Sequence, residues 1–298
     1  NAKGILPPAH PLSVGSALPQ GPLIEELAAA DVVLAVGTEL GETDTLYFGD
    51  RPKLGGKLIR IDIDAEQLTR NCLPDIAILG DAGLALAALA ERLQGFTHRG
   101  DGAARAEALR ARLDDLLDPR QRVHQRVLAT VQAALPNVIV VGDSTQPIYS
   151  ANLFYEPERP RSYFNSSTGY GTLGYALPAA LGAKLAARDR PVLAVIGDGG
   201  LQFTIGELAT AVELAMALPI IVWNNHGYGE IKRYMAERGI PQIGVDIYTP
   251  DFLAIACGFG CAAARARRLE ELPSLLREAN LRAGPTVIEI DEADAGSW

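Results

Sequence analysis

The sequence has few of the residues that characterise several protein classes. It contains three cysteines in 298 residues and no apolar run near the about 18 residues of a membrane-spanning helix. A small, odd number of cysteines predicts reduced thiols and a cytoplasmic protein. No block of lysine and arginine is present and the formal net charge is -9, so neither a nucleic acid nor a membrane is expected as a partner.

Two of the cysteines, Cys257 and Cys261, have a spacing that could form half of a metal site. A complete site would need further ligands, but the four histidines are scattered elsewhere in the chain. We therefore predict that both cysteines are small, buried, apolar residues.

Apolar runs of strand length alternate with segments of helical spacing, which predicts parallel α/β sheets. The predicted strands cover residues 32–37, 57–64, 75–80, 138–141, 191–196, 219–223 and 286–290. The predicted helices cover residues 23–30, 83–93, 121–134, 174–187, 205–217 and 269–282. A charged stretch between residues 95 and 119, interrupted by glycine and proline, predicts a linker with a solvent-exposed helix.

We expect an α/β fold with two Rossmann-like, three-layer domains built on parallel sheets. The length suits about two domains. The predicted boundaries give a central domain over residues 1–98, a linker over 99–119 and a C-terminal domain over 120–298. The chain opens on Asn1 without an initiator methionine and directly enters a domain-like pattern, so we also expect a fragment of a longer protein.

The strongest motif is a buried strand followed at once by Gly197, Asp198, Gly199 and Gly200. In open parallel sheets the carboxyl ends of strands face the ligand, and glycines there let backbone amides approach a phosphate. A dinucleotide site would need a glycine where this chain has Gln202, and Asp198 would repel a bare pyrophosphate. Asp198 therefore predicts a cation between its carboxylate and the phosphates.

The next predicted strand supplies further oxygen ligands, because it ends in Asn224 and Asn225 and reaches Gly227 two residues later. Mg²⁺ prefers six hard oxygen ligands in octahedral geometry. Asn225 offers an amide oxygen and Gly227 a main-chain carbonyl, in addition to the carboxylate of Asp198. The 24 residues between the Gly-Asp-Gly motif and the asparagine pair suffice for one helix and one strand, which return the chain to the same sheet edge.

Gly-Asp-Gly followed after 24 residues by an asparagine pair resembles the fingerprint of thiamine-diphosphate enzymes. The flanking sequence is similar to the superfamily of acetolactate synthase, benzoylformate decarboxylase and pyruvate decarboxylase. The similarity runs through HPLSVG (10–15), IDID (61–64) and GTLGYALPAALGAKLA (171–186), so it covers essentially the whole chain. The resemblance implies an enzyme that uses thiamine diphosphate and Mg²⁺ to decarboxylate a 2-oxo acid, with or without carboligation.

The resemblance also implies roles for individual residues. Leu173 matches the bulky apolar residue that props the thiazolium ring against the aminopyrimidine, although a plain core leucine fits the pattern too. The Gly171 carbonyl would accept a hydrogen bond from the 4′-amino group of the cofactor. Residues 144–146 could complete the diphosphate site or merely cap a helix. The implied cofactor-binding residues are Ser144, Thr145, Gln146, Gly171, Thr172, Leu173, Gly197, Asp198, Gly199, Gly200, Asn225, Gly227 and Tyr228, of which Asp198, Asn225 and Gly227 would hold the metal.

In this family the cofactor stores the electrons released when CO₂ leaves the substrate. A glutamate on an N-terminal domain, usually donated by a partner subunit, promotes deprotonation of the cofactor's thiazolium ring. No segment of this chain resembles that domain. We therefore expect that roughly 150 residues of N-terminal sequence are absent, that the chain is inactive alone, and that it forms a homodimer or tetramer through its thiamine diphosphate domains.

The substrate prediction depends on departures from the family patterns. Acetolactate synthases have a tryptophan at the place of Tyr234, and an arginine-containing flavin segment at residues 37–41, so the resemblance argues against that activity and against bound FAD. Yeast-type pyruvate decarboxylases have a catalytic glutamate at the place of Ile231. Glu230 points by helical phase toward the substrate region. With the loop 142–146 it suits a 5-guanidino-2-oxopentanoate decarboxylase, while a solvated glutamate at a helix start fits equally.

Two other functions stay open from the residues alone. One is a dinucleotide-binding oxidoreductase, which the lack of a second Gly-x-Gly-x-x-Gly motif disfavours. The other is a non-catalytic fragment that mediates assembly. The sequence does not determine which 2-oxo acid is used or whether carboligation follows decarboxylation.

Overall fold

The computed structural model describes residues 3–42, 53–96 and 100–298, which form two compact units. The smaller unit is Ala17–Leu116, and the larger unit joins the residues before Ala17 to Leu117–Trp298. The first residues belong to the larger unit because Lys3 Nζ donates to Tyr155 O at 2.7 Å and pairs with Glu156 at 3.2 Å. The expected boundary at residue 98 lies outside the described residues, and the expected domain limits stay predictions.

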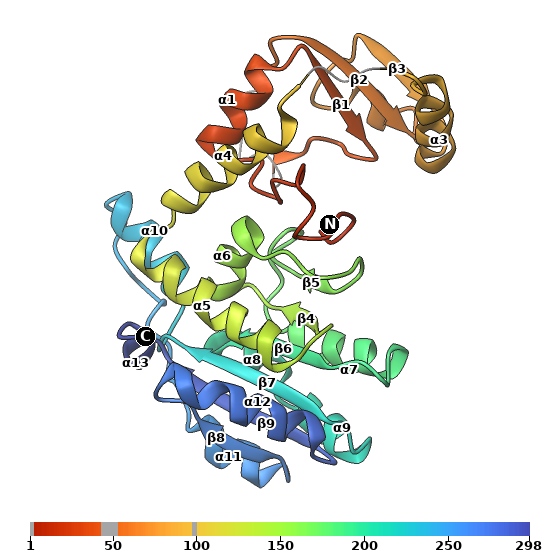
Figure 1. Cartoon of the computed structure of the whole chain (residues 1–298). Helices are drawn as coiled ribbons and strands as arrows, with labels where there is room; N and C mark the ends of the chain where they lie inside the picture. The colour runs from red at the N-terminus through yellow and green to blue at the C-terminus, as the bar shows by residue number, and fades with distance from the viewer. Residues whose placement is uncertain (1–2, 43–52, 97–99) are drawn as a thin grey trace. The chain divides into compact units, whose positions relative to one another are not determined.

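The smaller unit contains a parallel sheet of order β1-β2-β3 (Figure 1). Its strands are β1 (Val32–Val36), β2 (Lys57–Asp62) and β3 (Ile76–Leu79). Its helical segments are α1 (Gly21–Ala29), η1 (Gln67–Thr69), α3 (Ala82–Arg92) and α4 (Gly102–Asp115). Helix α4, predicted as a solvated helix in a linker, pairs with α1 through Glu26–Arg105 and Glu25–Arg112.

The larger unit is built on a six-stranded parallel sheet of order β5-β4-β6-β7-β9-β8. Strands β6 and β7 are consecutive in the chain and adjacent and parallel in the sheet, so they bring the glycine motif and the asparagine pair to the same edge. The strands are β4 (Ile139–Gly142), β5 (Tyr163–Asn165), β6 (Val192–Gly197), β7 (Leu218–Asn224), β8 (Ala262–Arg265) and β9 (Pro285–Asp291).

Helices cover both faces of this sheet, which gives three layers (Figure 1). One face packs against α5 (Pro119–Ala134), α6 (Gln146–Phe154), α12 (Leu272–Leu281) and α13 (Glu292–Ala295). The other face packs against α7 (Ala176–Ala186), α8 (Asp198–Thr204), α9 (Glu207–Glu213) and α11 (Phe252–Gly258). Helix α10 (Gly229–Glu237) follows β7 and has no buried residue.

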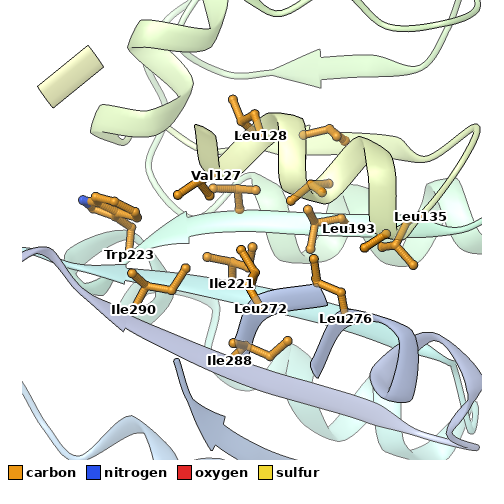
Figure 2. Packing of buried hydrophobic residues seen from close by; sticks show 14 of the residues in the cluster. Val127, Leu128, Leu135, Leu193, Ile221, Trp223, Leu272, Leu276, Ile288 and Ile290 are labelled. Carbon is orange, nitrogen blue, oxygen red and sulfur yellow. The ribbon is translucent and has the colours of Figure 1, made fainter. Parts of the chain in front are cut away.

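The two cores arise from the alternation of side chains along the strands. Leu193, Ile221 and Ile288, from three neighbouring strands, point to the face where Val127 of α5 and Leu276 of α12 pack (Figure 2). The residues next to them in each strand point to the opposite core. Each large apolar side chain buried in this way contributes about 1.5–3 kcal/mol, so the sheet is a rigid support for the residues at its carboxyl edge.

The predicted α/β class with two parallel sheets is confirmed, and each predicted strand agrees to within two residues at either end. The helix predicted over residues 205–217 is shorter, since α9 covers Glu207–Glu213. The edge strands β5 and β8 were not predicted, because three residues are too short for a pattern and the Ala-rich β8 has low strand propensity.

The prediction for the cysteines is half right, since Cys261 is buried but Cys257 is exposed. Cys257 lies on the outer face of α11, while Cys261 packs into the core below it. In the described part of the chain, none of the helices has the length and apolar character needed to cross a membrane.

Candidate cofactor site

The glycine motif and the asparagine pair meet because β6 and β7 are adjacent and in register. Gly197, the last residue of β6, lies opposite Trp223 in β7. Asp198, the residue after β6, and Asn224, the last residue of β7, therefore lie side by side at the carboxyl edge of the sheet. The sequence prediction that the two motifs lie close together is confirmed by this register.

The turn after β7 carries two unusual backbone conformations. His226 has φ of 59°, in the left-handed region, and Gly227 has φ of 154°. A Cβ on Gly227 would lie 2.6 Å from the carbonyl oxygen of Val245, so only glycine fits there. The turn is held by two main-chain donors: Gly227 N–H donates to Asp198 Oδ2 at 2.9 Å, and Tyr228 N–H donates to Val245 O at 2.9 Å.

Three oxygen atoms converge beside this turn. The side-chain oxygen of Asn225 lies 2.7 Å from the carbonyl oxygen of Gly227 and 3.2 Å from Asp198 Oδ1. Octahedral Mg²⁺ with bonds of about 2.0–2.1 Å requires neighbouring ligand oxygens to be about 3 Å apart. Without a cation, a half-turn of the amide would instead let its NH₂ group donate to both oxygens. The arrangement thus suits either a bound cation or an amide that closes the site.

Asp198 is a buried carboxyl group, which a bound cation would stabilise in its charged form. Its side chain is buried, at 1% exposure, and burial raises the pKa of the carboxyl above its ordinary value. Backbone hydrogen bonds from Gly199, Gly227 and Asn225 oppose that shift. In the described ranges, no cluster of three or more His, Cys, Asp or Glu residues could hold a metal, so any cation here would depend on amide and carbonyl oxygens in addition to the Asp198 carboxylate.

The glycines of the motif make room for close approach of a ligand. A Cβ on Gly199 would lie 2.8 Å from a ring carbon of Tyr228, and a Cβ on Gly200 would lie 3.3 Å from the carboxyl carbon of Asp143. Larger residues would therefore push these side chains or the turn itself out of place. Backbone amides exposed by glycine are the groups that commonly cradle phosphate oxygens, so these residues fit a diphosphate group.

The predicted site residues surround one cavity of about 160 Å³ in the larger unit. Of the predicted cofactor residues, only Thr172 is not among those that line it. The cavity also takes in Glu230, the predicted substrate contact. Its lining consists of Ser144, Thr145, Gln146, Tyr149, Gly171, Leu173, Gly197, Asp198, Gly199, Gly200, Asn225, Gly227, Tyr228, Gly229, Glu230 and Ile231.

Three lining residues were not predicted as site residues: Gly229 and Ile231, on either side of Glu230, and Tyr149. Tyr149 is the one that comes from a separate element. It lies four residues after Thr145, which caps the start of α6, so it falls one helical turn into the same face as Thr145. Burial raises the pKa of Tyr149 above its ordinary value, and a hydrogen bond with Ser144 opposes the shift. Recognition of α6 from the proline that follows Gln146 would have predicted this residue.

The loop before α6 has a structural role as well as a place in the cavity. Asp143 is fully buried, accepts hydrogen bonds from the main-chain N–H groups of Ser144 at 2.8 Å and Ala176 at 3.1 Å, and so joins β4 to the start of α7. Burial raises the pKa of the Asp143 carboxyl, and these backbone donors oppose the shift. Thr145 is the N-cap residue of α6, its side chain makes no capping hydrogen bond, and the residue lines the cavity.

Glu230 faces the cavity from the first turn of α10, and its carboxylate is paired with a guanidinium of the same helix. Arg233 donates to both oxygens of Glu230, with Nε 3.3 Å from Oε2, and also pairs with Glu237. The Glu230 side chain is 39% exposed. A planar guanidinium fork can therefore reach this carboxylate in the folded protein.

Comparison with known protein families identifies the site. The family model described as the thiamine pyrophosphate enzyme C-terminal TPP binding domain matches residues 141–290, which include the whole cavity. The chain belongs to the thiamine pyrophosphate enzymes. The central domain model of the same enzymes matches residues 1–89. The predicted superfamily and its cofactor are thus confirmed, and the dinucleotide-binding alternative is not supported.

Individual known proteins resemble the chain along most of its length. A probable 2-ketoarginine decarboxylase of Pseudomonas aeruginosa is 42% identical over 296 residues, which are 98% of this chain and 52% of the relative. The acetolactate synthase large subunit of Corynebacterium glutamicum is 30% identical over 324 residues, covering 100% and 50%. Benzoylformate decarboxylase of P. aeruginosa is 30% identical over 262 residues, covering 87% and 48%. The chain therefore spans about half the length of these relatives.

Proposed function

We propose that the protein is part of an enzyme that decarboxylates a 2-oxo acid with thiamine diphosphate held through Mg²⁺. One observation carries the proposal: one end of the Asn225 side-chain amide lies 2.7 Å from the Gly227 carbonyl oxygen and 3.2 Å from Asp198 Oδ1, where its oxygen would form a ligand set with them around a cation. The spacing of about 3 Å expected between adjacent Mg²⁺ ligands agrees with these values. The relatives named as 2-ketoarginine and benzoylformate decarboxylases support the reaction class.

The chain's own residues would bind and orient the cofactor. Asp198, Asn225 and the Gly227 carbonyl would supply three ligands of Mg²⁺, and the amides of Gly199 and Gly200 would donate to the diphosphate. When bound, thiamine diphosphate supplies an electron sink for the carbon that loses CO₂. The protein's contribution is to hold that cofactor in one geometry.

Two further residues would fix the conformation of the cofactor. Leu173 lines the cavity and is half-buried, which suits an apolar prop under the ring system better than a plain core position. Gly171, with φ of 66°, also lines the cavity, and its carbonyl is the acceptor proposed for the 4′-amino group. Thr172 lies between them and is exposed, so its contribution would come from the main chain.

We further propose that the substrate carries a guanidino tail, as in 5-guanidino-2-oxopentanoate. The carboxylate of Glu230 lines the cavity and is already bonded by the guanidinium of Arg233. A substrate guanidinium would make the same bidentate contact, with Arg233 retaining its pairing with Glu237. The 42% identity to a probable 2-ketoarginine decarboxylase supports this choice over a neutral 2-oxo acid.

We propose a homo-oligomer whose subunits complete each other's sites. A cavity of about 160 Å³ is smaller than the roughly 300–1,000 Å³ of common ligand pockets, which supports a cofactor that extends beyond this unit. Exposed apolar side chains lie close to the cavity residues in the sequence: Tyr170 precedes Gly171, and Ile231 and Tyr234 lie on α10. Exposed apolar groups of this kind support a subunit interface there. The free thiols of Cys257 and Cys261 support a cytoplasmic location.

The test is an assay of the full-length enzyme against a panel of 2-oxo acids, with CO₂ release as the readout. The panel contains 5-guanidino-2-oxopentanoate, 2-oxopentanoate, benzoylformate and pyruvate, each with and without thiamine diphosphate and Mg²⁺. Cofactor-dependent release that is fastest with the guanidino acid supports the proposal. Release from none of the acids, together with no cofactor binding, would instead support a role in assembly only.

A further inference from the structure

A buried carboxylate lies next to the strand that ends in the asparagine pair. Glu289 of β9 is 3% exposed and has donors on both sides. Its Oε1 accepts a hydrogen bond from Asn224 Nδ2 of β7 at 2.8 Å. Its Oε2 accepts from Arg265 of β8, from Nε at 3.0 Å and Nη2 at 2.7 Å. One side chain thus joins the carboxyl ends of three neighbouring strands.

Asn224 connects the buried Glu289 carboxylate to the turn that follows β7. Its Oδ1 accepts the main-chain N–H of His226 at 3.1 Å, so both ends of its amide are used. His226 lies in the left-handed region, at φ of 59°, which is unfavourable for a residue with a Cβ. The turn therefore depends on an external restraint to keep Asn225 and Gly227 where they are.

A second contact from β9 reaches the same turn but is weaker. His226 Nε2 lies 2.9 Å from Asp291 Oδ2, yet the histidine side chain is 58% exposed. Solvent competes for an exposed contact of this kind, whereas the Asn224–Glu289 hydrogen bond is buried. The buried contact is therefore the one that fixes the turn.

We infer that Glu289 is a positioning residue that holds the turn 224–227 in the geometry that binds the Mg²⁺ ion and diphosphate. The inference rests on the proposed function and adds to it a residue that touches neither cofactor nor metal. Partners behind the ligands of a metal commonly change its affinity about 10–100-fold when they are replaced. Arg265 completes the arrangement by satisfying the second oxygen of the buried carboxylate.

The inference can be tested by exchanging the carboxylate and the amide between positions 289 and 224. In Glu289→Gln, the single oxygen of the new amide cannot accept from both Asn224 and Arg265. In Asn224→Asp, two carboxylates face each other. In the double variant, Gln at 289 can donate to Asp at 224 and accept from Arg265, while His226 N–H keeps its acceptor. The matched control is Ile288→Val, a neighbouring core change on the same strand that touches neither asparagine.

The measurement is the Kd of thiamine diphosphate for the full-length enzyme at saturating Mg²⁺, together with the apparent Kd of Mg²⁺ at saturating cofactor, both by calorimetry. We expect each single variant to bind about 10–100-fold more weakly, the double variant to recover most of that loss, and Ile288→Val to bind like the wild type. Thermal unfolding of each protein without cofactor shows how far folding has changed.

Two results would overturn the inference alone. One is wild-type affinity in Glu289→Gln, and the other is a double variant that binds no more tightly than the weaker single variant. If a single variant fails to fold, the comparison of the double variant with the wild type still decides, because its hydrogen bonds are complete. A wild-type enzyme that binds no thiamine diphosphate would overturn the proposed function itself.

Discussion

The main-chain N–H of Gly227 donates a hydrogen bond of 2.9 Å to Oδ2 of Asp198, across 29 residues of sequence. This contact leaves the other oxygen, Oδ1, facing the amide of Asn225 at 3.2 Å. Asp198 thus has one oxygen for the turn and one for a ligand.

Replacement of Gly199 by alanine should weaken cofactor binding without unfolding the protein. The added Cβ would lie 2.8 Å from the ring of Tyr228 and 3.2 Å from Ile247 Cδ1, so the turn must shift. Overpacking of this kind costs about 1–3 kcal/mol, and the turn would have to return to its native position to bind the diphosphate, so we expect the Kd of thiamine diphosphate to rise about tenfold. Calorimetric titration of the full-length enzyme measures it.

Gly182→Ala is the matched control for this substitution. Gly182 lies inside α7, and a Cβ there would meet nothing within 4 Å. Alanine should stabilise the helix by about 0.4–1 kcal/mol and leave cofactor affinity unchanged. If Gly199→Ala bound the cofactor as tightly as this control, close approach to the glycine turn would not be required.

Glu230→Gln should discriminate against a guanidino substrate. The variant keeps the shape of the side chain but loses the charge that attracts a guanidinium. Hydrogen bonds to charged groups contribute about 1.5–3 kcal/mol, and for this partly exposed carboxylate the lower value corresponds to a roughly tenfold rise in KM. The KM for 2-oxopentanoate should stay unchanged, and steady-state CO₂ release measures both.

Glu237→Gln serves as the control for Glu230. Glu237 also pairs with Arg233 but does not line the cavity. Its replacement should change neither KM. An equal effect of Glu230→Gln on the guanidino and neutral acids would show that Glu230 is only a solvated residue at the start of α10.

Stability should fall with acid because of His124. This histidine is 1% exposed, lies edge-on to Trp223 and bonds Ser150 Oγ through Nδ1 at 2.8 Å. Burial, with a smaller contribution from Arg120, lowers its pKa from 6.5 to about 4. In the unfolded chain the imidazole of His124 therefore becomes protonated near pH 6.5, whereas in the folded protein it stays neutral until the pH falls to about 4.

The sign and size of this effect follow from linkage. The contribution of neutral His124 is complete above pH 6.5 and is lost as the pH falls toward about 4, by on the order of 3 kcal/mol. Urea denaturation at several pH values measures the free energy of unfolding. His124→Gln does not titrate, so its stability should depend less on pH over that window. Equal slopes for both proteins would contradict the assignment.

The sequence predicted the parts of the site that are local and missed those that depend on neighbours. Asp198 and Asn225 could be paired in advance because apolar runs mark β6 and β7 and parallel strands end at one edge. No pattern joins Asn224 to Glu289, 65 residues away, because the contact depends on β9 lying next to β7.

Two other features were beyond the reach of sequence patterns. The strand β8 is made of three alanines and an arginine, and its state is set by pairing with β9 rather than by propensity. The pairing of Glu230 with Arg233 depends on side-chain rotamers, whereas helical phase alone indicated only the face on which Glu230 lies.

The most direct test of the account is a titration of the full-length enzyme with thiamine diphosphate, in Mg²⁺ and in EDTA, for the wild type, Asn225→Asp and Asn225→Ala. Aspartate keeps an oxygen at the converging position, and alanine removes it. We expect Mg²⁺-dependent binding by the wild type and by Asn225→Asp, and its loss in Asn225→Ala. Equal binding by the wild type in Mg²⁺ and in EDTA would contradict a cation shared by Asp198 and Asn225.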